Sequence, residues 1–98
     1  MAILTRDTGL VEKDISAENT FSDGLYTEDA FNLSISGTFV ATVTVQRSFD
    51  QGATWRDVET FTAPIETYGI DPGPTVAYRA GVKTGDYTSG TVSIRIGR

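Results

Sequence analysis

The residues best placed to do chemistry in this sequence are Asp57 and Glu59, two carboxylates in the segment 54–62. On a β-strand, residues two apart project from the same face at about 6–7 Å. That separation superficially suits the carboxylate pair that cleaves a glycosidic bond. An exposed strand face explains the two residues more simply, with Arg56 and Arg79 as charge partners. We therefore expect a structural role.

Other kinds of catalysis have few residues to build on. The sequence contains no histidine and no cysteine, so the commonest general base and any thiolate are missing. No Ser-His-Asp or phosphate-cradling arrangement can be built. Asp71 in GIDPGP and Asp86 in TGDYTSG are typical of turns; the alternative, a calcium site, would need oxygen ligands from elsewhere. The sequence predicts a protein without catalytic residues, cofactor or metal.

The stretch SFDQGATW, from Ser48 to Trp55, has the pattern Ser-x-Asp-x-Gly-x-Thr-Trp. It resembles the Asp-box of sialidases and related propeller enzymes, which in that family lies at hairpin tips away from the catalytic site. We expect Asp50 to accept hydrogen bonds from the amides of the turn, and Gly52 to take the left-handed conformation. Thr54 completes the pattern, and Trp55 is expected to cover the turn with its ring.

The motif alone does not make the chain a propeller enzyme. A propeller needs several blades of about 40–45 residues each, and the chain has 98 residues. The turn is therefore predicted to be structural, and direct carbohydrate binding by Trp55 is the alternative.

Apolar and polar residues alternate in several segments, which predicts β-strands with one buried face. The alternation is seen over 31–35, 39–49, 76–82 and 91–96. In the segment 39–49, the polar residues expected to face solvent are Thr42, Thr44, Gln46 and Ser48. No window shows a sustained helical period.

Turn signals rich in Gly, Pro, Asp and Ser separate these segments; they are SDG at 22–24, SGT at 36–38, DQG at 50–52, DPGP at 71–74, TGD at 84–86 and SG at 89–90. Short strands at such intervals predict an all-β antiparallel sandwich of about seven or eight strands, either Ig-like or jelly-roll-like. We expect this domain to span residues 21–98.

The segment 1–20 is less regular and is predicted to form an extended N-terminal arm. Such an arm can pair with a strand of another subunit. The candidate interface residues are Ile3, Leu4, Leu10 and Val11 in the arm, together with the aromatic residues Tyr68 and Tyr87.

The net charge of −5 comes from the first third of the chain. Residues 1–30 hold seven carboxylates and two basic residues, which also gives −5, so residues 31–98 sum to zero. This acidity disfavours nucleic-acid binding, which needs Lys and Arg to neutralise phosphates. A solvated face is the simplest explanation, and docking against a basic partner is the alternative.

No stretch approaches the roughly 20 apolar residues of a membrane span, and without a signal-peptide pattern we expect a cytoplasmic protein until assembly.

The run 31–98 combines SGTF, TVQRSFD, GATW, GVKTGDYTSGT and RIGR. In this combination it resembles small β-rich proteins encoded among the virion genes of tailed bacteriophages. The resemblance implies a non-enzymatic virion structural protein, assembled in the host cytoplasm, and transfers no catalytic residue.

Within a virion, a capsid decoration or cement protein fits a small acidic β-sandwich with an arm. The expected partners are the major capsid protein or other virion proteins, and the expected homo-oligomer is a trimer, because a closed ring buries sandwich edges. The alternatives are a tail, neck or fibre component and a carbohydrate-binding module.

Overall fold

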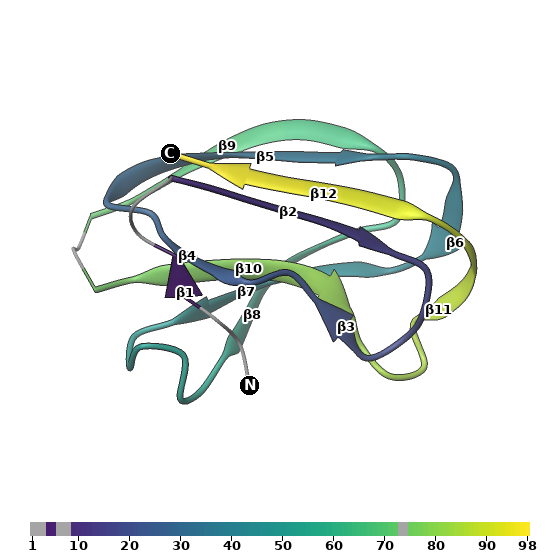
Figure 1. The fold of residues 1–98 in the computed structure, drawn as a ribbon, viewed down its shortest axis with the longest axis horizontal. Coiled ribbons are helices and arrows are strands. Elements are labelled where there is room, and N and C mark those ends of the chain that lie inside the picture. Colours follow the sequence, from purple (N-terminus) through teal and green to yellow (C-terminus); the bar gives the residue numbers. More distant parts are fainter. Residues whose placement is uncertain (1–3, 6–8, 73–74) are drawn as a thin grey trace.

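The computed structural model describes residues 4–5, 9–72 and 75–98. These residues form β-strands joined by turns, and they contain no helix (Figure 1). The strands are β1 (Leu4–Thr5), β2 (Leu10–Ile15), β3 (Thr20–Phe21), β4 (Gly24–Tyr26), β5 (Asp29–Ser36), β6 (Phe39–Ala41), β7 (Val43–Ser48), β8 (Arg56–Phe61), β9 (Ile65–Asp71), β10 (Ala77–Val82), β11 (Tyr87–Gly90) and β12 (Val92–Gly97).

Two main sheets pack face to face (Figure 1). The six-stranded sheet has the order β1-β4-β10-β7-β8, with β3 also paired to β10, and the four-stranded sheet has the order β2-β12-β5-β9. A separate β6–β11 pair lies at one end. All these pairs are antiparallel except β1 with β4. The predicted all-β antiparallel sandwich is confirmed.

The strand pairs have the nested order of a jelly roll. Setting aside β1, β3 and the β6–β11 pair, eight strands remain. The first pairs with the eighth (β2 with β12), the second with the seventh (β4 with β10), the third with the sixth (β5 with β9) and the fourth with the fifth (β7 with β8). This is one long antiparallel hairpin rolled into two sheets. Of the two sandwich types left open by the sequence, the topology is jelly-roll-like.

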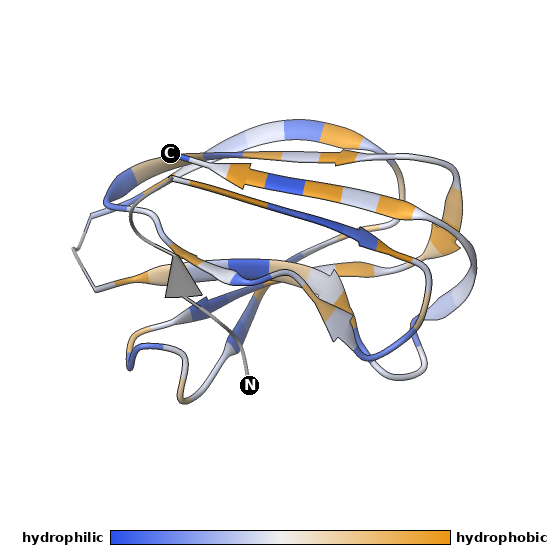
Figure 2. Cartoon of the chain, viewed as in Figure 1, coloured by the Kyte–Doolittle hydropathy of each residue, from blue (hydrophilic) through white to orange (hydrophobic). Residues whose placement is uncertain are grey.

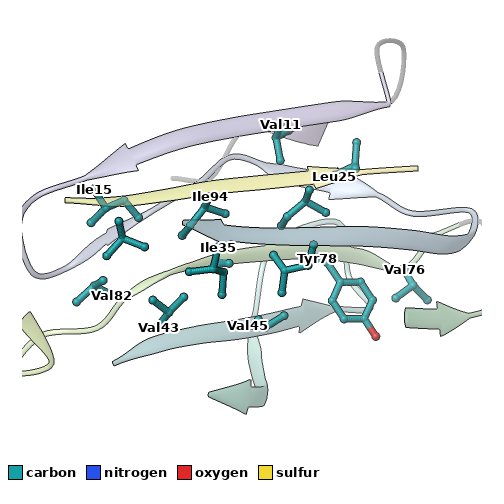
Figure 3. Close-up of a cluster of buried hydrophobic side chains, with 14 residues drawn as sticks. Val11, Ile15, Leu25, Ile35, Val43, Val45, Val76, Tyr78, Val82 and Ile94 are labelled. Atoms are coloured by element: carbon teal, nitrogen blue, oxygen red, sulfur yellow. The ribbon is translucent and has the colours of Figure 1, made fainter. Parts of the chain in front are cut away.

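The hydrophobic core lies between the two sheets. Alternate residues of β5, β10 and β12 point into it, and Figure 2 shows this alternation of apolar and polar residues along β12. Figure 3 shows the side chains that fill the space between the sheets. Each large side chain fully buried here stabilises the fold by about 1.5–3 kcal/mol; those under 2% exposed include Ile15, Leu25, Ile35, Val43, Val82, Val92 and Ile96.

A sharp corner joins the main sheets to the β6–β11 pair, and glycines permit it. Gly37 has φ 102°, and a Cβ atom there would lie 2.4 Å from the carbonyl oxygen of Thr91. Gly90 has φ 90° and would likewise clash with Thr38. The predicted single strand over 39–49 is therefore two strands: β6 ends before Thr42 and pairs with β11, whereas β7 belongs to the six-stranded sheet.

The predicted arm is wrong for residues 10–15, because they form β2. This strand pairs with β12 over six residues, and its Val11 and Ile15 are 6% and 0% exposed in the core. The alternation was hidden because Lys13 occupies the position between them on the same face. A lysine can take this position on an edge strand since its long side chain reaches water. The sandwich therefore begins before residue 21.

Candidate functional site

The turn between β7 and β8 is built around the carboxylate of Asp50. Its Oδ1 atom accepts a hydrogen bond from the backbone N–H of Thr54 at 2.9 Å, and its Oδ2 atom accepts one from the Thr54 hydroxyl at 2.6 Å. The Ser48 hydroxyl donates to Asp50 Oδ1 at 2.8 Å and accepts from the N–H of Gly52 at 2.8 Å. Four residues of the motif thus hold one another in a closed turn.

The backbone of this turn explains the glycine. Gly52 has φ 89°, in the left-handed region that glycine enters without strain, and Gln51 before it has φ 62°. The hydrogen bonds from the side chain and then the backbone of Thr54, followed by that from Ser48, lower the pKa of Asp50 to about 2. The carboxylate is therefore ionised at neutral pH and serves the turn.

The ring of Trp55, at the end of the turn, contacts an arginine of β10. The Cζ atom of Arg79, on β10, lies 4.5 Å from the centre of the Trp55 ring and 4.3 Å from that of the Phe21 ring. Burial lowers the pKa of Arg79, but a guanidinium stays charged at any ordinary pH. Trp55, which we expected to cover the turn, forms a cation–π contact with Arg79. The ring face that meets Arg79 is not available to a sugar.

The same stack lies on the outer face of the six-stranded sheet. The sequence predicted that the residues of β7 on this face would be exposed to solvent. Thr44 and Gln46 are only 1% and 8% exposed. Their cross-strand partners on β10 are Gly81 and Arg79, and Phe21 lies directly over Gly81. The prediction of a solvent-facing side for β7 is wrong, because alternation shows which residues share a face but not what covers that face.

Gln46 links the stack to a second charged group. Arg79 Nε donates to Gln46 Oε1 at 2.9 Å, and Gln46 Nε2 donates to Asp57 Oδ1 at 2.9 Å. Lys83 Nζ lies 2.8 Å from Asp57 Oδ2. The hydrogen bond from Lys83, followed by that from Gln46, lowers the pKa of Asp57. The charge partner of Asp57 is therefore Lys83, in place of the predicted Arg56 and Arg79.

Asp57 and Glu59 do not form the same-face pair that their spacing predicted. Glu59 is opposite Val45 and Asp57 is opposite Gln46, so Val58 between them is the extra residue of a β-bulge. Because Val45 and Gln46 point to opposite faces, their two partners do so as well. Glu59 lines a cleft between the sheets, whereas Asp57 lies on the outer face. The arrangement needed for glycoside cleavage is absent from this strand.

Asp71 joins the two sheets at one end of the sandwich. The Tyr78 hydroxyl donates to Asp71 Oδ2 at 2.6 Å, and Arg47 Nη1 donates to the same oxygen at 3.3 Å. Burial of the phenol, followed by its hydrogen bond to Asp71, raises the pKa of Tyr78 to about 12.

Asp86 lies in a turn, where its N–H donates to the carbonyl of Lys83 at 3.1 Å. Within the described ranges, no three acidic side chains gather as they would around a metal ion.

A cleft of about 190 Å³ opens between β8 and β9, the edge strands of the two sheets. Inside it Phe31 packs on Tyr78, with ring centres 4.4 Å apart, and Gly69 leaves room for Phe31. This volume is below the roughly 300–1,000 Å³ of a typical small-molecule site. The lining is mostly apolar and includes Leu33, Val45, Val58 and Phe61, with Glu59 and Thr67 as polar groups.

The residues predicted to meet a partner have different positions. Val11 belongs to the core of this chain, which corrects its assignment to an interface. Tyr87 is half-buried against the core and donates its hydroxyl to the carbonyl of Gly90 at 2.8 Å. Leu10 is half-buried at the start of β2. Leu4 lies in β1, and Ile3 lies outside the described residues.

Among the predicted interface residues whose burial the structure describes, Tyr68 is open to solvent, with 78% of its surface exposed. Two positions further along β9, Ile70 is 68% exposed; the sequence reasoning missed it, although alternation with the inward-facing residues could have revealed it. We call the outward-facing residues Glu66, Tyr68 and Ile70 the β9 edge. A hollow of about 300 Å³ lies beside it, lined by Ala30, Phe31, Asn32, Tyr68, Ile70 and Arg98.

No helix in the part of the chain that the structure describes is long and apolar enough to cross a membrane. Comparisons of the chain with protein-family models, curated proteins and solved structures find no match. The residues and their geometry therefore carry the functional inference.

Proposed function

We propose that this chain is a non-enzymatic structural protein of a tailed-bacteriophage virion, placed on the capsid as a decoration or cement protein. The resemblance of residues 31–98 to small β-rich virion proteins supports this assignment. The jelly-roll topology is compatible with it, since the same architecture recurs in viral capsid proteins and in lectins. Because one fold serves many functions, the choice between these functions has to rest on the surface residues.

The observation that carries the proposal is the apolar β9 edge. Tyr68 and Ile70 are 78% and 68% exposed on a strand that ends its sheet. Large exposed apolar side chains on a sheet edge are typical of a protein contact. By contrast, three of the carboxylates considered above have internal partners: Asp50 holds its own turn, Asp57 binds Lys83, and Asp71 accepts from Tyr78.

A capsid surface suits such an edge because it offers the same contact many times. Each contact can be weak, since multivalent attachment multiplies the strength of the whole layer. The major capsid protein is the proposed partner. Attachment through apolar packing should resist salt, because exposed ion pairs contribute only about 0–1 kcal/mol each and are screened.

The test is cryo-electron microscopy of purified particles before and after a high-salt wash. Density for this chain on the capsid surface in both samples supports the proposal. Density confined to the tail, neck or fibres in both samples rejects the capsid location and favours the alternative. Matched particles from a phage with this gene deleted identify the density that belongs to the chain. Specific sugar binding by the isolated protein, with no density on particles, would replace the proposal with a carbohydrate-binding module.

A further inference from the structure

The edges of the sandwich differ in how they are protected against pairing with another strand. The edge strand β2 exposes three consecutive charged residues, Glu12, Lys13 and Asp14. The edge strand β8 has a bulge at Val58 and exposed charges on either side of it. Charges and bulges are the usual protection of an edge. β1, which ends the six-stranded sheet beside β4, pairs over only two residues.

β9 has less protection: it has no bulge, and its exposed charged residue is Glu66, near the start of the strand. It pairs with β5 over seven consecutive residues without a register shift, and its free side has no strand partner in the described chain. Two of its three outward-facing residues are the exposed apolar Tyr68, at its centre, and Ile70. A long, regular and mostly apolar edge is a site of strand addition. We therefore expect another strand to pair with the free side of β9.

The sequence of β9 fits a second copy of itself. With Tyr68 opposite Tyr68 in an antiparallel pair, Glu66 is opposite Ile70, and Thr67 is opposite Gly69. Ile65 is then opposite Asp71, so all seven residues are paired and no carboxylate faces another. Like charges directly opposite would destabilise the pair, whereas aromatic pairs stabilise it.

We propose that β9 pairs with β9 of a second copy across a two-fold axis that passes beside Tyr68. Outward-facing residues then meet outward-facing residues, so the two four-stranded sheets join into one continuous eight-stranded sheet. The two tyrosines and two isoleucines form one apolar patch, flanked by the hollow beside each β9 edge. A two-fold contact uses the edge of both copies and closes at the dimer.

This inference specifies the homo-oligomer within the proposed function, and it replaces the trimer expected from the sequence with a dimer. Strand pairing uses the backbone on the free side of β9, so the side chains of Tyr68 and Ile70 stay on the outer face of the joined sheet, where they can still meet the capsid. Its test uses the isolated full-length chain. The dimer can therefore fail while the chain is still found on particles, and it can be present if the chain is not a virion protein.

The absence of cysteine from the sequence makes disulfide trapping a clean test. Directly opposed residues of an antiparallel pair have Cα atoms about 4.5–5.5 Å apart, which lies within disulfide range. Tyr68→Cys should therefore give a covalent dimer under mild oxidation, seen on a non-reducing gel. Ile70→Cys is the matched control on the same strand and face, because its Cα atoms in the two copies would be four residues apart along the pair, roughly 13 Å.

The mass of the wild-type chain in solution gives the second measurement. Analytical ultracentrifugation at sub-millimolar concentration should show a dimer. Tyr68→Lys should raise the dissociation constant about 100-fold, because the substitution occurs twice at a two-fold interface and sets two ammonium groups opposite each other. Val40→Lys is the control, since Val40 is 58% exposed on β6, away from β9, and it should leave the constant unchanged.

Three results would overturn the proposal. One is a wild-type chain that is monomeric or trimeric. Another is equal cross-linking of the two cysteine variants, or cross-linking of Ile70→Cys alone. The third is a dimer that Tyr68→Lys weakens no more than Val40→Lys does.

Discussion

The guanidinium carbon of Arg79 lies 4.5 Å from the centre of the Trp55 ring, so a residue of β10 packs on the residue that ends the β7–β8 turn. The same guanidinium contacts the Phe21 ring and donates to Gln46 of β7. One cation therefore connects β3, the turn and β7 on the outer face of the six-stranded sheet.

A double-mutant cycle measures this connection. Trp55→Ala and Arg79→Ala should each lower the free energy of unfolding, and together they should cost less than the sum of the single effects. We expect a coupling energy of about 0.5–2 kcal/mol, the range of a partly desolvated cation–π contact. Trp55→Ala with Arg95→Ala is the control pair, since Arg95 bonds to Asn32 on the other sheet. Additive effects in the Trp55–Arg79 cycle would show that the two residues have no coupling free energy.

The β7–β8 turn gives a second prediction. Gly52→Val should lower the free energy of unfolding by about 1–3 kcal/mol, because valine is strained at φ 89°. Asp50→Ala should also lower the melting temperature, since it removes the hydrogen bonds to both groups of Thr54. Gln51→Ala, which changes an exposed side chain, is the control. Thermal melts that superimpose for all three variants and the wild type would exclude a stabilising turn.

The pKa of Asp50 predicts how the turn responds to acid. Its folded-state pKa, about 2, lies below the ordinary value of 3.8, so the unfolded chain takes up a proton first as the pH falls. The stabilisation by this carboxylate is complete above about pH 4 and is lost as the pH falls through about 2. The difference in melting temperature between wild type and Asp50→Asn should therefore shrink over this window. Gly52→Val changes no titratable group, so its difference in melting temperature from the wild type should stay constant. A wild-type melting temperature that remains above that of Asp50→Asn below pH 2 would contradict this explanation.

The place of β2 in the core gives a fourth prediction. Ile15→Ala should lower the free energy of unfolding by about 2–5 kcal/mol, because Ile15 is 0% exposed and its loss leaves a cavity. Glu12→Ala, on the solvent side of the same strand, should change it by less than about 0.5 kcal/mol. Deleting residues 1–15 should unfold the protein, as judged by circular dichroism and urea titration. A folded deletion variant would restore the idea of a dispensable arm.

The sequence predicted what depends on local pattern. Alternation identified the buried faces of β10 and β12, and the Asp-box pattern located a turn in which Asp50 accepts from its neighbours. These features depend on residues that are close together in the chain, so their physical cause can be read from a short window.

The features that could not be predicted depend on distant segments or on a single irregular residue. The bulge at Val58 turns Asp57 and Glu59 to opposite faces, and no local signal marks it. β2 was missed because Lys13 interrupts its apolar face. The burial of Gln46 depends on Arg79, thirty-three residues away. The free side of β9 within the described residues follows only from the sheet order, which depends on pairing between distant segments.

The copy number of this chain in purified virions tests the proposed function most directly. It can be measured by quantitative mass spectrometry of whole particles, with isotope-labelled peptides of this chain and of the major capsid protein as internal standards. A decoration protein should be present in numbers comparable with those of the capsid subunits themselves. A chain that is absent from the particles, or present in only a few copies, would contradict the assignment to the capsid.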